Sequence, residues 1–384
     1  MEFTCKESVL TLFPVGEINS YSAPEVEAEI DKIIAKSKFS SIVLNFSAVS
    51  YLSSAGLRIV LKLKQRYNEV KIIEASLEVY DVLQMTGFTS MMEVHKKLRE
   101  VDVSHAEKIG EGFFSIVYRI DKDTIIKVFR QATSIQNVER ELNLAKQAFV
   151  LGIPTAISFD VVKVGELLGV RFEMLDCASL RDVFRDHPER TDEFIEKYVN
   201  LLKTINATID IDPSLPQAKE QWREKIAYCA KYLDKAEAKK LSAMYEKIPD
   251  AQTFVHGDCH YKNIMVQGDE LLLIDMDTLC TGHPIFELAA LYAPYFAFEM
   301  DDPGNTETFL GLSAEFTQKM YIKVLDLYLG KHDEEAIAKI ACLCYAHMIW
   351  WNGMNAPDNK VRHEGNLKRL KESLKTLEDF DIGI

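Results

Sequence analysis

The sequence predicts a two-domain protein: a small α/β unit over residues 1–100, followed by an α+β unit over residues 105–384. Two observations predict this. The first hundred residues alternate strand-like and helix-like segments, whereas the remainder begins with strand-like runs and then becomes mainly helical. In addition, 384 residues exceed the roughly 100–200 of one ordinary domain. The join at 100–105 contains no Gly or Pro, so a continued helix is an alternative to a flexible tether.

The composition excludes several classes of protein. With 47% hydrophobic and 27% charged residues, the chain is close to the globular average. A net charge of −14 makes nucleic acid a poor partner. The longest mostly apolar run, Leu288–Phe298, contains Pro294 and is shorter than the ~18 residues that a membrane span needs. No signal peptide is recognisable, so we expect a cytoplasmic protein without a membrane partner.

The seven cysteines predict no covalent or metal framework. Their number is odd, and no two of them form a C-x-x-C pair. Neither a disulfide scaffold nor a thiolate zinc site is therefore indicated, and we expect reduced cysteines that act as small hydrophobic residues.

The elements of the first unit follow from the period of its apolar residues. Runs rich in β-branched residues predict strands, and apolar residues at helical spacing predict helices. The predicted strands are Val9–Val15, Ser41–Phe46 and Val70–Glu74, and the predicted helices are Ala23–Ser37, Gly56–Tyr67 and Leu77–Met85.

The second unit divides into a strand-rich lobe, 105–177, and a helical lobe, 178–384. The first contains the strand-like runs Ser115–Ile120 and Thr124–Phe129. The second is helical by period, with a hairpin at Ile264–Ile274 as the exception. Its clearest predicted helices are Asp192–Ile205, Gln221–Leu233, Ala236–Ile248 and Glu315–Leu329.

A glycine-rich segment opens the second unit. Gly110, Gly112 and Ser115 lie between two strand-like runs, in the pattern G-x-G-x-x-S. Glycine permits a tight turn, which brings backbone amides close to the phosphates of a nucleotide. A glycine-rich hairpin without a ligand is the alternative reading.

Lys127 is a charged residue within an apolar strand, Thr124–Phe129. A buried lysine needs a partner, and the following helical stretch offers Glu139 and Glu141. We favour Glu141, because Leu142 beside it belongs to the packed face of the helix. The alternative for Lys127 is a solvent-facing edge position.

The end of the strand-rich lobe predicts a nucleotide-binding hinge. The run Val170–Leu175 ends in a segment, Phe172–Leu175, that would connect the two lobes. We expect Glu173 and Leu175 to contact an adenine or guanine base there.

The strongest motif lies in the helical lobe, where residues 256–263 read H-G-D-C-H-Y-K-N. An aspartate followed five residues later by an asparagine places a carboxylate and a carboxamide on one short loop. Asp258 would accept a proton and Asn263 would bind magnesium. Asp275, at the end of an apolar run, would bind a metal ion that bridges the phosphates. His256 and His260 have the spacing of a helical zinc pair, but Gly257 disfavours a helix between them.

These motifs resemble the aminoglycoside phosphotransferase and choline kinase group, a branch of the protein-kinase-like fold, over about 105–300. The resemblance implies a bilobal kinase-like domain, with Mg²⁺ and ATP or GTP as cofactors. It implies that Asp258 is the catalytic base and that Lys127 contacts the α- and β-phosphates, oriented by Glu141. It also implies a structural role for His256, and for Asp277 either loop support or a second metal ion. The sequence contains no D-F-G or A-P-E motif, so an activation loop has no support.

A serine pair in the first unit stands where a strand and turn lead into a helix. Ser53 and Ser54 are natural N-cap residues, and a phosphate is tolerated at a helix N-terminus. A cap without further function is the alternative. With Gly16-Glu17-Ile18-Asn19, the unit resembles a STAS domain of the anti-sigma-factor antagonist type. This resemblance implies a protein partner whose binding is switched by phosphorylation of Ser54, although Ser53 and Asn19 stand where aspartates are common.

The sequence identifies the residues that would bind the phosphoryl acceptor less clearly than the other parts of the site. Trp350 and Trp351, with Tyr345 and His347, form either an aromatic wall for a cationic or sugar acceptor or the core of a helix, Ala336–Trp351. A surplus of 13 acidic residues over 101–384 (33 basic, 46 acidic) suits an amine-bearing acceptor or serves solubility.

Three functions remain open from the sequence. The first is a Mg-dependent kinase that phosphorylates a hydroxyl of an aminoglycoside, sugar or amino alcohol, with a regulatory STAS module. The second is a protein-serine kinase-like regulator that acts on Ser54. The third is a nucleotide-sensing, partner-switching protein with little turnover.

Overall fold

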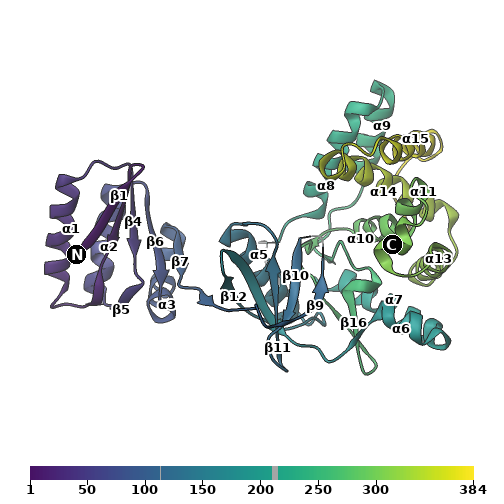
Figure 1. Ribbon diagram of the computed structural model, residues 1–384. Helices are drawn as coiled ribbons and strands as arrows, with labels where there is room; N and C mark the ends of the chain where they lie inside the picture. Colours follow the sequence, from purple (N-terminus) through teal and green to yellow (C-terminus); the bar gives the residue numbers. More distant parts are fainter. Residues whose placement is uncertain (113, 210–214) are drawn as a thin grey trace. The chain divides into compact units, whose positions relative to one another are not determined.

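The computed structural model describes residues 1–112, 114–209 and 215–384. The chain forms two compact units, Met1–Val101 and Asp102–Ile384 (Figure 1). The join is not a continued helix, because β8 (Arg99–Glu100) is followed by irregular chain. The Asp102 side chain accepts the backbone N–H of Ser104 at 2.8 Å, a local turn that competes with helix formation. Among the described residues, no helix has the length and apolarity of a membrane span.

The first unit is a mixed sheet with helices. Strands are neighbours in the order β1-β2-β4-β6-β7, antiparallel between β1 and β2 and parallel elsewhere, and β3 pairs with β5 in parallel. The strands are β1 (Glu2–Lys6), β2 (Val9–Phe13), β3 (Val15–Ile18), β4 (Ser41–Asn45), β5 (Ala48–Leu52), β6 (Val70–Ala75) and β7 (Val94–Lys96). The helices are α1 (Ala23–Lys36), α2 (Ser54–Arg66), α3 (Leu77–Met85) and α4 (Phe88–Met91).

The core of the first unit follows from strand alternation and one close approach. Leu10 and Leu12, two residues apart on β2, are fully buried on the same face. Helix α2 comes close to the β3–β5 pair at Gly56. A Cβ atom added there would lie 2.6 Å from Leu52 Cδ1 and 2.9 Å from the Ile18 carbonyl oxygen. Only glycine fits this contact.

The second unit begins with antiparallel strands covered by one helix. Its strands β9 to β13 are neighbours in the order β12-β13-β11-β10-β9, and α5 packs on β12 and β13. On β11, Ile126 and Val128 are buried on one face, which places Lys127 on the other. The elements are β9 (Glu107–Glu111), β10 (Ser115–Arg119), β11 (Thr124–Phe129), α5 (Ile135–Val150), β12 (Ser158–Val164) and β13 (Leu167–Glu173).

The rest of the second unit is mainly helical, as Figure 1 shows. A long apolar helix, α14, packs against α8, α10 and α15, and α7 packs against α13. The helices are α6 (Leu180–Asp186), α7 (Thr191–Ala207), α8 (Ala218–Cys229), α9 (Lys235–Glu246), α10 (Ile285–Tyr292), α11 (Phe298–Met300), α12 (Asn305–Leu310), α13 (Ala314–Leu329), α14 (Glu334–Asn355) and α15 (Lys360–Thr376). A π-helical turn, Ala293–Ala297, joins α10 to α11.

Short strands carry the loops of the helical part. Strands β14 (Ala178–Ser179), β16 (Ile264–Gln267) and β17 (Glu270–Leu273) form one sheet, and β15 (Phe254–Val255) pairs with β18 (Cys280–Thr281). The 256–263 loop runs from β15 to β16, and residues 274–279 run from β17 to β18. Both segments therefore begin and end at paired strands, which fixes them beside each other. All seven cysteines are free, as the sequence predicts.

The close approach at Gly56 generates a stability prediction. Gly56→Ala forces a methyl group into the Leu52 and Ile18 contact, and we expect a loss of about 1–3 kcal/mol in the free energy of unfolding. Urea unfolding of the full chain, followed by circular dichroism, measures this. Ser54→Ala at the exposed start of the same helix is the matched control, with a change below about 0.5 kcal/mol. Equal effects of the two substitutions would contradict the packing argument.

Candidate active site

A buried ion-pair cluster joins the strand-rich and helical parts of the second unit. Lys127 Nζ donates to Glu141 Oε1 and to Asp275 Oδ1, each at 2.7 Å. The Lys127 side chain is only 13% exposed, which rules out the solvent-facing alternative. Burial lowers the pKa of Lys127, but the charges of Asp275 and Glu141 outweigh it and the net shift is upward. The amine therefore stays protonated.

Glu139 and Glu141 occupy different faces of α5. Glu141 is buried beside Lys127, whereas Glu139 lines a cavity on the other side of the helix. Burial raises the pKa of Glu141, and the charge of Lys127 opposes that rise. The helical period decides between the two residues, because positions two apart on a helix point in different directions.

Asp275 adopts a strained backbone conformation directly after β17. Its φ of 67° lies in the left-handed region, which non-glycine residues rarely occupy. Burial raises its pKa, yet the adjacent Lys127 more than compensates and the net shift is downward. For Asp277, burial and the negative charge of Asp275 raise the pKa to about 7. Asp275 is thus the carboxylate that stays ionised.

Asp258 and Asn263 meet across one tight loop. Asn263 Nδ2 donates to the Asp258 carbonyl oxygen and to Asp258 Oδ2, both at 3.0 Å. The Asp258 side chain is 44% exposed, and its Oδ1 lies 3.4 Å from His260 Nε2. Burial of the site, followed by the charge of Asp275, raises the pKa of Asp258 to about 7. The loop therefore presents an accessible carboxylate with a strong affinity for a proton.

Side chains from distant segments hold the backbone of this loop. The fully buried Glu287 on α10 accepts the N–H groups of His256 at 2.5 Å and of Gly257 at 3.2 Å. Tyr198 on α7 donates its hydroxyl to the Cys259 carbonyl oxygen at 2.7 Å. The Tyr295 hydroxyl, in the π-helical turn, accepts the Tyr261 N–H at 3.1 Å.

Sequence reasoning missed Glu287, although the signal was visible as a single acidic residue in the apolar helix Ile285–Tyr292. A buried acid requires partners, and here the partners are backbone amides. Burial raises the pKa of Glu287 to about 7, opposed by its hydrogen bonds from Gly257 and His256.

His256 and Gly257 shape the start of the loop. The imidazole of His256 is fully buried, and its Nδ1 accepts the Asp258 N–H at 3.3 Å. Burial lowers the pKa of His256 to about 4, so the ring is neutral. Gly257 has a φ of +80°, and a Cβ there would lie 3.4 Å from the Thr278 carbonyl oxygen. Both residues serve the turn, and the zinc pair has no support from this geometry.

The glycine-rich segment and the hinge lie at the ends of the strand-rich part. Gly110 belongs to β9, and the Gly112 N–H donates to the Ser115 carbonyl oxygen at 2.9 Å. Neither glycine has a positive φ. The tip of the turn, residue 113, lies outside the described residues.

At the predicted hinge, Glu173 is the last residue of β13, and its side chain accepts the Ile157 N–H at 2.8 Å. Leu175 follows in irregular chain.

The oxygen atoms at the centre of the site suit a hard cation. Asn263 donates its amide nitrogen to Asp258, which leaves its carbonyl oxygen free to bind a cation. Asp275 supplies a carboxylate within the same cluster. Within 1–112, 114–209 and 215–384, no group of three or more His, Cys, Asp or Glu could form a metal site by itself. Magnesium sites with one or two protein ligands and nucleotide phosphates have this composition.

In the first unit, the two serines differ in role. Ser53 caps α2, because its Oγ accepts the Ala55 N–H at 3.2 Å and donates to the Ile18 carbonyl oxygen at 3.0 Å. Ser54 is the first residue of α2 and is exposed to solvent. The Asn19 side chain accepts the N–H groups of Tyr21 and Ser22 and so shapes the loop after β3.

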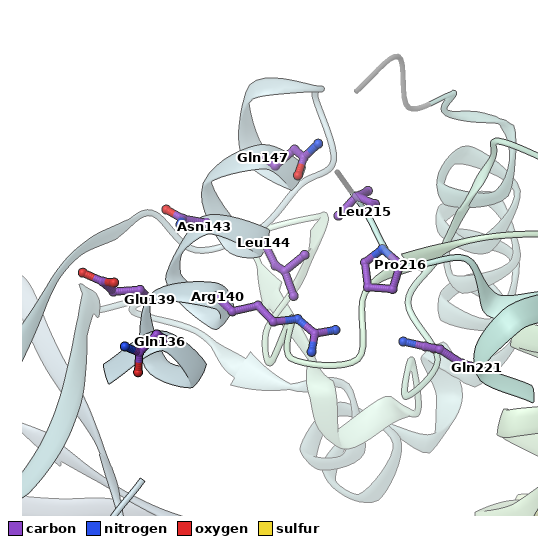
Figure 2. Close-up of a pocket in the computed structure, with 9 residues that line it drawn as sticks. All are labelled: Gln136, Glu139, Arg140, Asn143, Leu144, Gln147, Leu215, Pro216 and Gln221. Carbon is purple, nitrogen blue, oxygen red and sulfur yellow. The ribbon is translucent and has the colours of Figure 1, made fainter. Parts of the chain in front are cut away.

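A separate cavity of about 710 Å³ lies between α5 and the start of α8 (Figure 2). Six residues of α5 form one wall, and Leu215, Pro216 and Gln221 form the other. The Arg140 side chain extends from α5 toward Pro216 and Gln221, whereas the Glu139 carboxylate points away from them (Figure 2).

Comparison with known proteins agrees with this geometry. A family model described as "Phosphotransferase enzyme family" matches residues 105–310, and a STAS domain model matches residues 1–101. Residues of the first unit are 35% identical, over 83 positions, to the putative anti-sigma factor antagonist BtrV of Bordetella bronchiseptica. That alignment covers 21% of this chain and 71% of BtrV.

Solved structures that match part of this chain include an aminoglycoside phosphotransferase and a choline kinase. The ADP-bound aminoglycoside phosphotransferase APH(2'')-Ib is 14% identical, with a TM-score of 0.48 over 77% of this chain and 98% of its own. Choline kinase of Cryptosporidium parvum is 12% identical, with a TM-score of 0.40 over 71% and 90% of the two chains.

The family matches confirm the predicted fold class, a small α/β STAS domain followed by a kinase-like domain. The match at 105–310 spans more than half of the chain, and it contains the Lys127–Glu141–Asp275 cluster and the Asp258 loop. The chain therefore belongs to the phosphotransferase enzyme family, as a kinase-type enzyme with an N-terminal STAS domain.

Proposed function

We propose that this protein transfers the γ-phosphoryl group of ATP or GTP to a hydroxyl group of a small molecule, with Mg²⁺ as cofactor. In this proposal, residues 105–384 are the phosphotransferase domain and residues 1–100 a regulatory module that binds a protein partner. The observation that carries the proposal is Asp258, an accessible carboxylate of raised pKa held in place beside Asn263.

Asp258 is the proposed catalytic base. As the acceptor oxygen bonds to the γ-phosphorus, the bond from that phosphorus to the bridging β–γ oxygen breaks, and the nucleoside diphosphate leaves. The proton of the acceptor hydroxyl passes to the Asp258 carboxylate. A carboxylate with a pKa near neutrality accepts this proton more readily than an ordinary aspartate. The Asn263 amide orients the carboxylate from one side.

Lys127 is proposed to contact the α- and β-phosphates, with Glu141 orienting its amine. Asn263 and Asp275 would hold Mg²⁺, which neutralises phosphate charge when it is bound. Gly110, Gly112 and Ser115 would lie over the phosphates, and Glu173 and Leu175 against the base. The support for these roles is that Lys127 contacts both Glu141 and Asp275 at 2.7 Å, and that Asn263 contacts Asp258 at 3.0 Å.

Removal of the proposed base should abolish turnover but not binding. We expect Asp258→Asn to lower kcat by about 10²–10⁴-fold, because proton acceptance is lost while the side-chain shape is kept. A coupled assay of nucleoside diphosphate release, with calorimetry of nucleotide binding, separates the two effects. Glu270→Gln, on an exposed strand position, is the control and should retain full turnover. Undiminished turnover of Asp258→Asn would refute the assigned role.

Glu287 is a positioning residue, and its test differs from that of the base. Glu287→Gln weakens two charged hydrogen bonds to the loop backbone, each worth about 1.5–3 kcal/mol. We expect kcat to fall at least about tenfold, with little change in the KM for nucleotide. Glu287→Asp keeps a carboxylate at this position on a side chain that is one methylene shorter. Its kcat should therefore lie between those of Glu287→Gln and the unchanged protein. If Asp and Gln gave the same kcat, charge at this position would be irrelevant to the loop.

A second candidate acceptor is Ser54 of the chain itself or of another copy. The observation that favours it is an exposed hydroxyl at the first residue of α2. Positive charge at a helix N-terminus stabilises a phosphate there by about 0.3–1 kcal/mol. The BtrV similarity supports a protein partner for this module.

Mass mapping tests this candidate. If Ser54 is an acceptor, incubation with ATP and magnesium should add 1 phosphate (about 80 Da) to the peptide that contains Ser54. Asp258→Asn should lose this modification, and Ser54→Ala should remove it while leaving small-molecule turnover unchanged. A module that stays unmodified in both cis and trans reactions eliminates the candidate.

A further inference from the structure

The 256–263 loop contains a buried histidine to which the mechanism above gives no role. The His260 side chain is buried, and its Nε2 atom lies 3.4 Å from Asp258 Oδ1. Its Nδ1 atom is also buried and has no hydrogen-bond partner within the described part of the chain. Buried polar groups usually have partners, so the placement of this ring beside the proposed base requires an explanation.

The two histidines of the loop contact different parts of Asp258. His256 Nδ1 accepts the Asp258 backbone N–H at 3.3 Å, so it shapes the main chain. His260 Nε2 faces the carboxylate instead. Asn263 Nδ2 donates to the other carboxylate oxygen, Oδ2, at 3.0 Å. A different side chain therefore flanks each oxygen of the proposed base.

Both the backbone and the ring of His260 are held in place. Its N–H donates to the Asp258 carbonyl oxygen, and its carbonyl oxygen accepts the Asn263 N–H, each at 2.8 Å. The ring packs against Phe309 of α12, with centroids 5.3 Å apart and planes at 87°. Lys262 donates its amine to the Phe309 carbonyl oxygen at 2.7 Å. The loop is thus fixed to Phe309 through two residues, and the imidazole stays beside Asp258.

The surroundings of the two ring nitrogens indicate which of them carries the proton. A neutral imidazole has one N–H donor and one acceptor nitrogen. A proton on Nδ1 would bury an N–H group without an acceptor, which is costly. It would also turn the lone pair of Nε2 toward a carboxylate. A proton on Nε2 avoids both penalties, because this N–H group faces Asp258 Oδ1. Burial lowers the pKa of His260 to about 4, in agreement with a neutral ring.

The Asp258 carboxylate needs a second donor to keep one orientation. It is partly exposed, and a single hydrogen bond from Asn263 leaves the carboxyl group able to rotate. The 3.4 Å separation from His260 exceeds the length of a normal hydrogen bond. Contacts of this kind in unliganded active sites often shorten when the substrates bind. A restrained carboxylate matters because catalytic groups act within about 0.5 Å of one productive geometry.

We propose that His260 is a positioning residue for phosphoryl transfer: its Nε2–H group holds Asp258 Oδ1, so that the carboxylate keeps the orientation in which it receives the proton of the acceptor hydroxyl. The imidazole itself takes up no proton in this step. The role rests on the proposed function, because it acts through the proposed base. The contact between the two side chains is measured without turnover, which keeps the two questions separate.

Amide substitutions test the role of each ring nitrogen. A glutamine side chain can place its amide nitrogen near the position of Nε2, whereas the shorter asparagine reaches only the position of Nδ1. We expect His260→Gln to keep kcat within about threefold, and His260→Asn and His260→Leu to lower it at least about tenfold, through loss of one charge-assisted hydrogen bond. The KM for ATP should change little, because Lys127 and Asp275 are untouched.

Turnover is measured as ADP release from ATP and magnesium, with water, glucose, serinol and kanamycin as the acceptors. His332→Gln is the matched control, because His332 forms an exposed pair with Asp326 at 2.8 Å. Its kcat should equal that of the unchanged protein. Thermal unfolding shows whether each variant is folded.

A double-mutant cycle separates action through Asp258 from a general effect on the loop. If the ring acts through the base, His260→Leu should cause no further loss of turnover in the Asp258→Asn background. The residual rate of that background is followed under single-turnover conditions. A loss by the same factor in both backgrounds would show an independent effect and would overturn the proposal.

Nuclear magnetic resonance of the full chain, with isotope-labelled histidine rings, tests the contact without turnover. We expect His260 to carry its proton on Nε2, and the signal is assigned by its absence from His260→Gln. Asp258→Ala removes the acceptor, so the Nε2–H proton signal should move to lower frequency and exchange faster with water. A ring protonated on Nδ1, or a signal that Asp258→Ala leaves unchanged, contradicts the contact.

The two kinds of measurement distinguish this inference from the proposed function. If the unchanged protein releases no ADP with any of these acceptors, the proposed function fails, and the resonance experiment alone decides whether His260 holds Asp258. If turnover occurs but His260→Gln and His260→Asn have the same kcat, the proposed function stands and the positioning role is overturned.

Discussion

The structure depends on one buried amine. Lys127 Nζ holds Glu141 of α5 and Asp275 after β17 at 2.7 Å each, so it joins segments 148 residues apart in the chain. An unpaired charge in this position would cost several kcal/mol, and the two carboxylates remove most of that cost. In return, the positive charge keeps Asp275 ionised, while the pKa values of Asp277 and Asp258 are raised by burial and by Asp275 itself. Lys127 lowers the pKa of all three acids, but it outweighs burial only at Asp275.

The loop that presents Asp258 is supported from within the helical core. Glu287, Tyr198 and Tyr295 each satisfy backbone groups of residues 256–261 from separate helical segments. Burial of a carboxylate such as Glu287 is unfavourable unless hydrogen bonds compensate it. Apolar residues would fill the same space without that penalty. The arrangement therefore favours the position of the loop over stability, a compromise expected at functional sites.

Much of this could be predicted from local patterns. The alternation around Lys127 and the helical period of α5 indicated which glutamate would face the amine, because both patterns depend only on near neighbours. The tight turn at Gly110 and Gly112 stays a prediction, because its tip, residue 113, lies outside the described residues. A positive φ occurs at Asp275, which the sequence analysis did not single out for backbone strain. The sequence did not predict the contacts of Lys225, because its partners, Trp222 and Trp350, come from two helices that only folding brings together.

The sequence by itself determined the two units, the main helices and strands with clear periodicity and the residues of the 256–263 loop, because periodicity and short motifs are properties of adjacent residues. Tertiary structure alone decided which charges are paired. It placed Glu287 under the loop, left Arg140 facing a cavity and covered Trp350 with a lysine rather than leaving it open to a ligand. The reason is physical: the sign and strength of an electrostatic site depend on distances between side chains that the linear order does not contain.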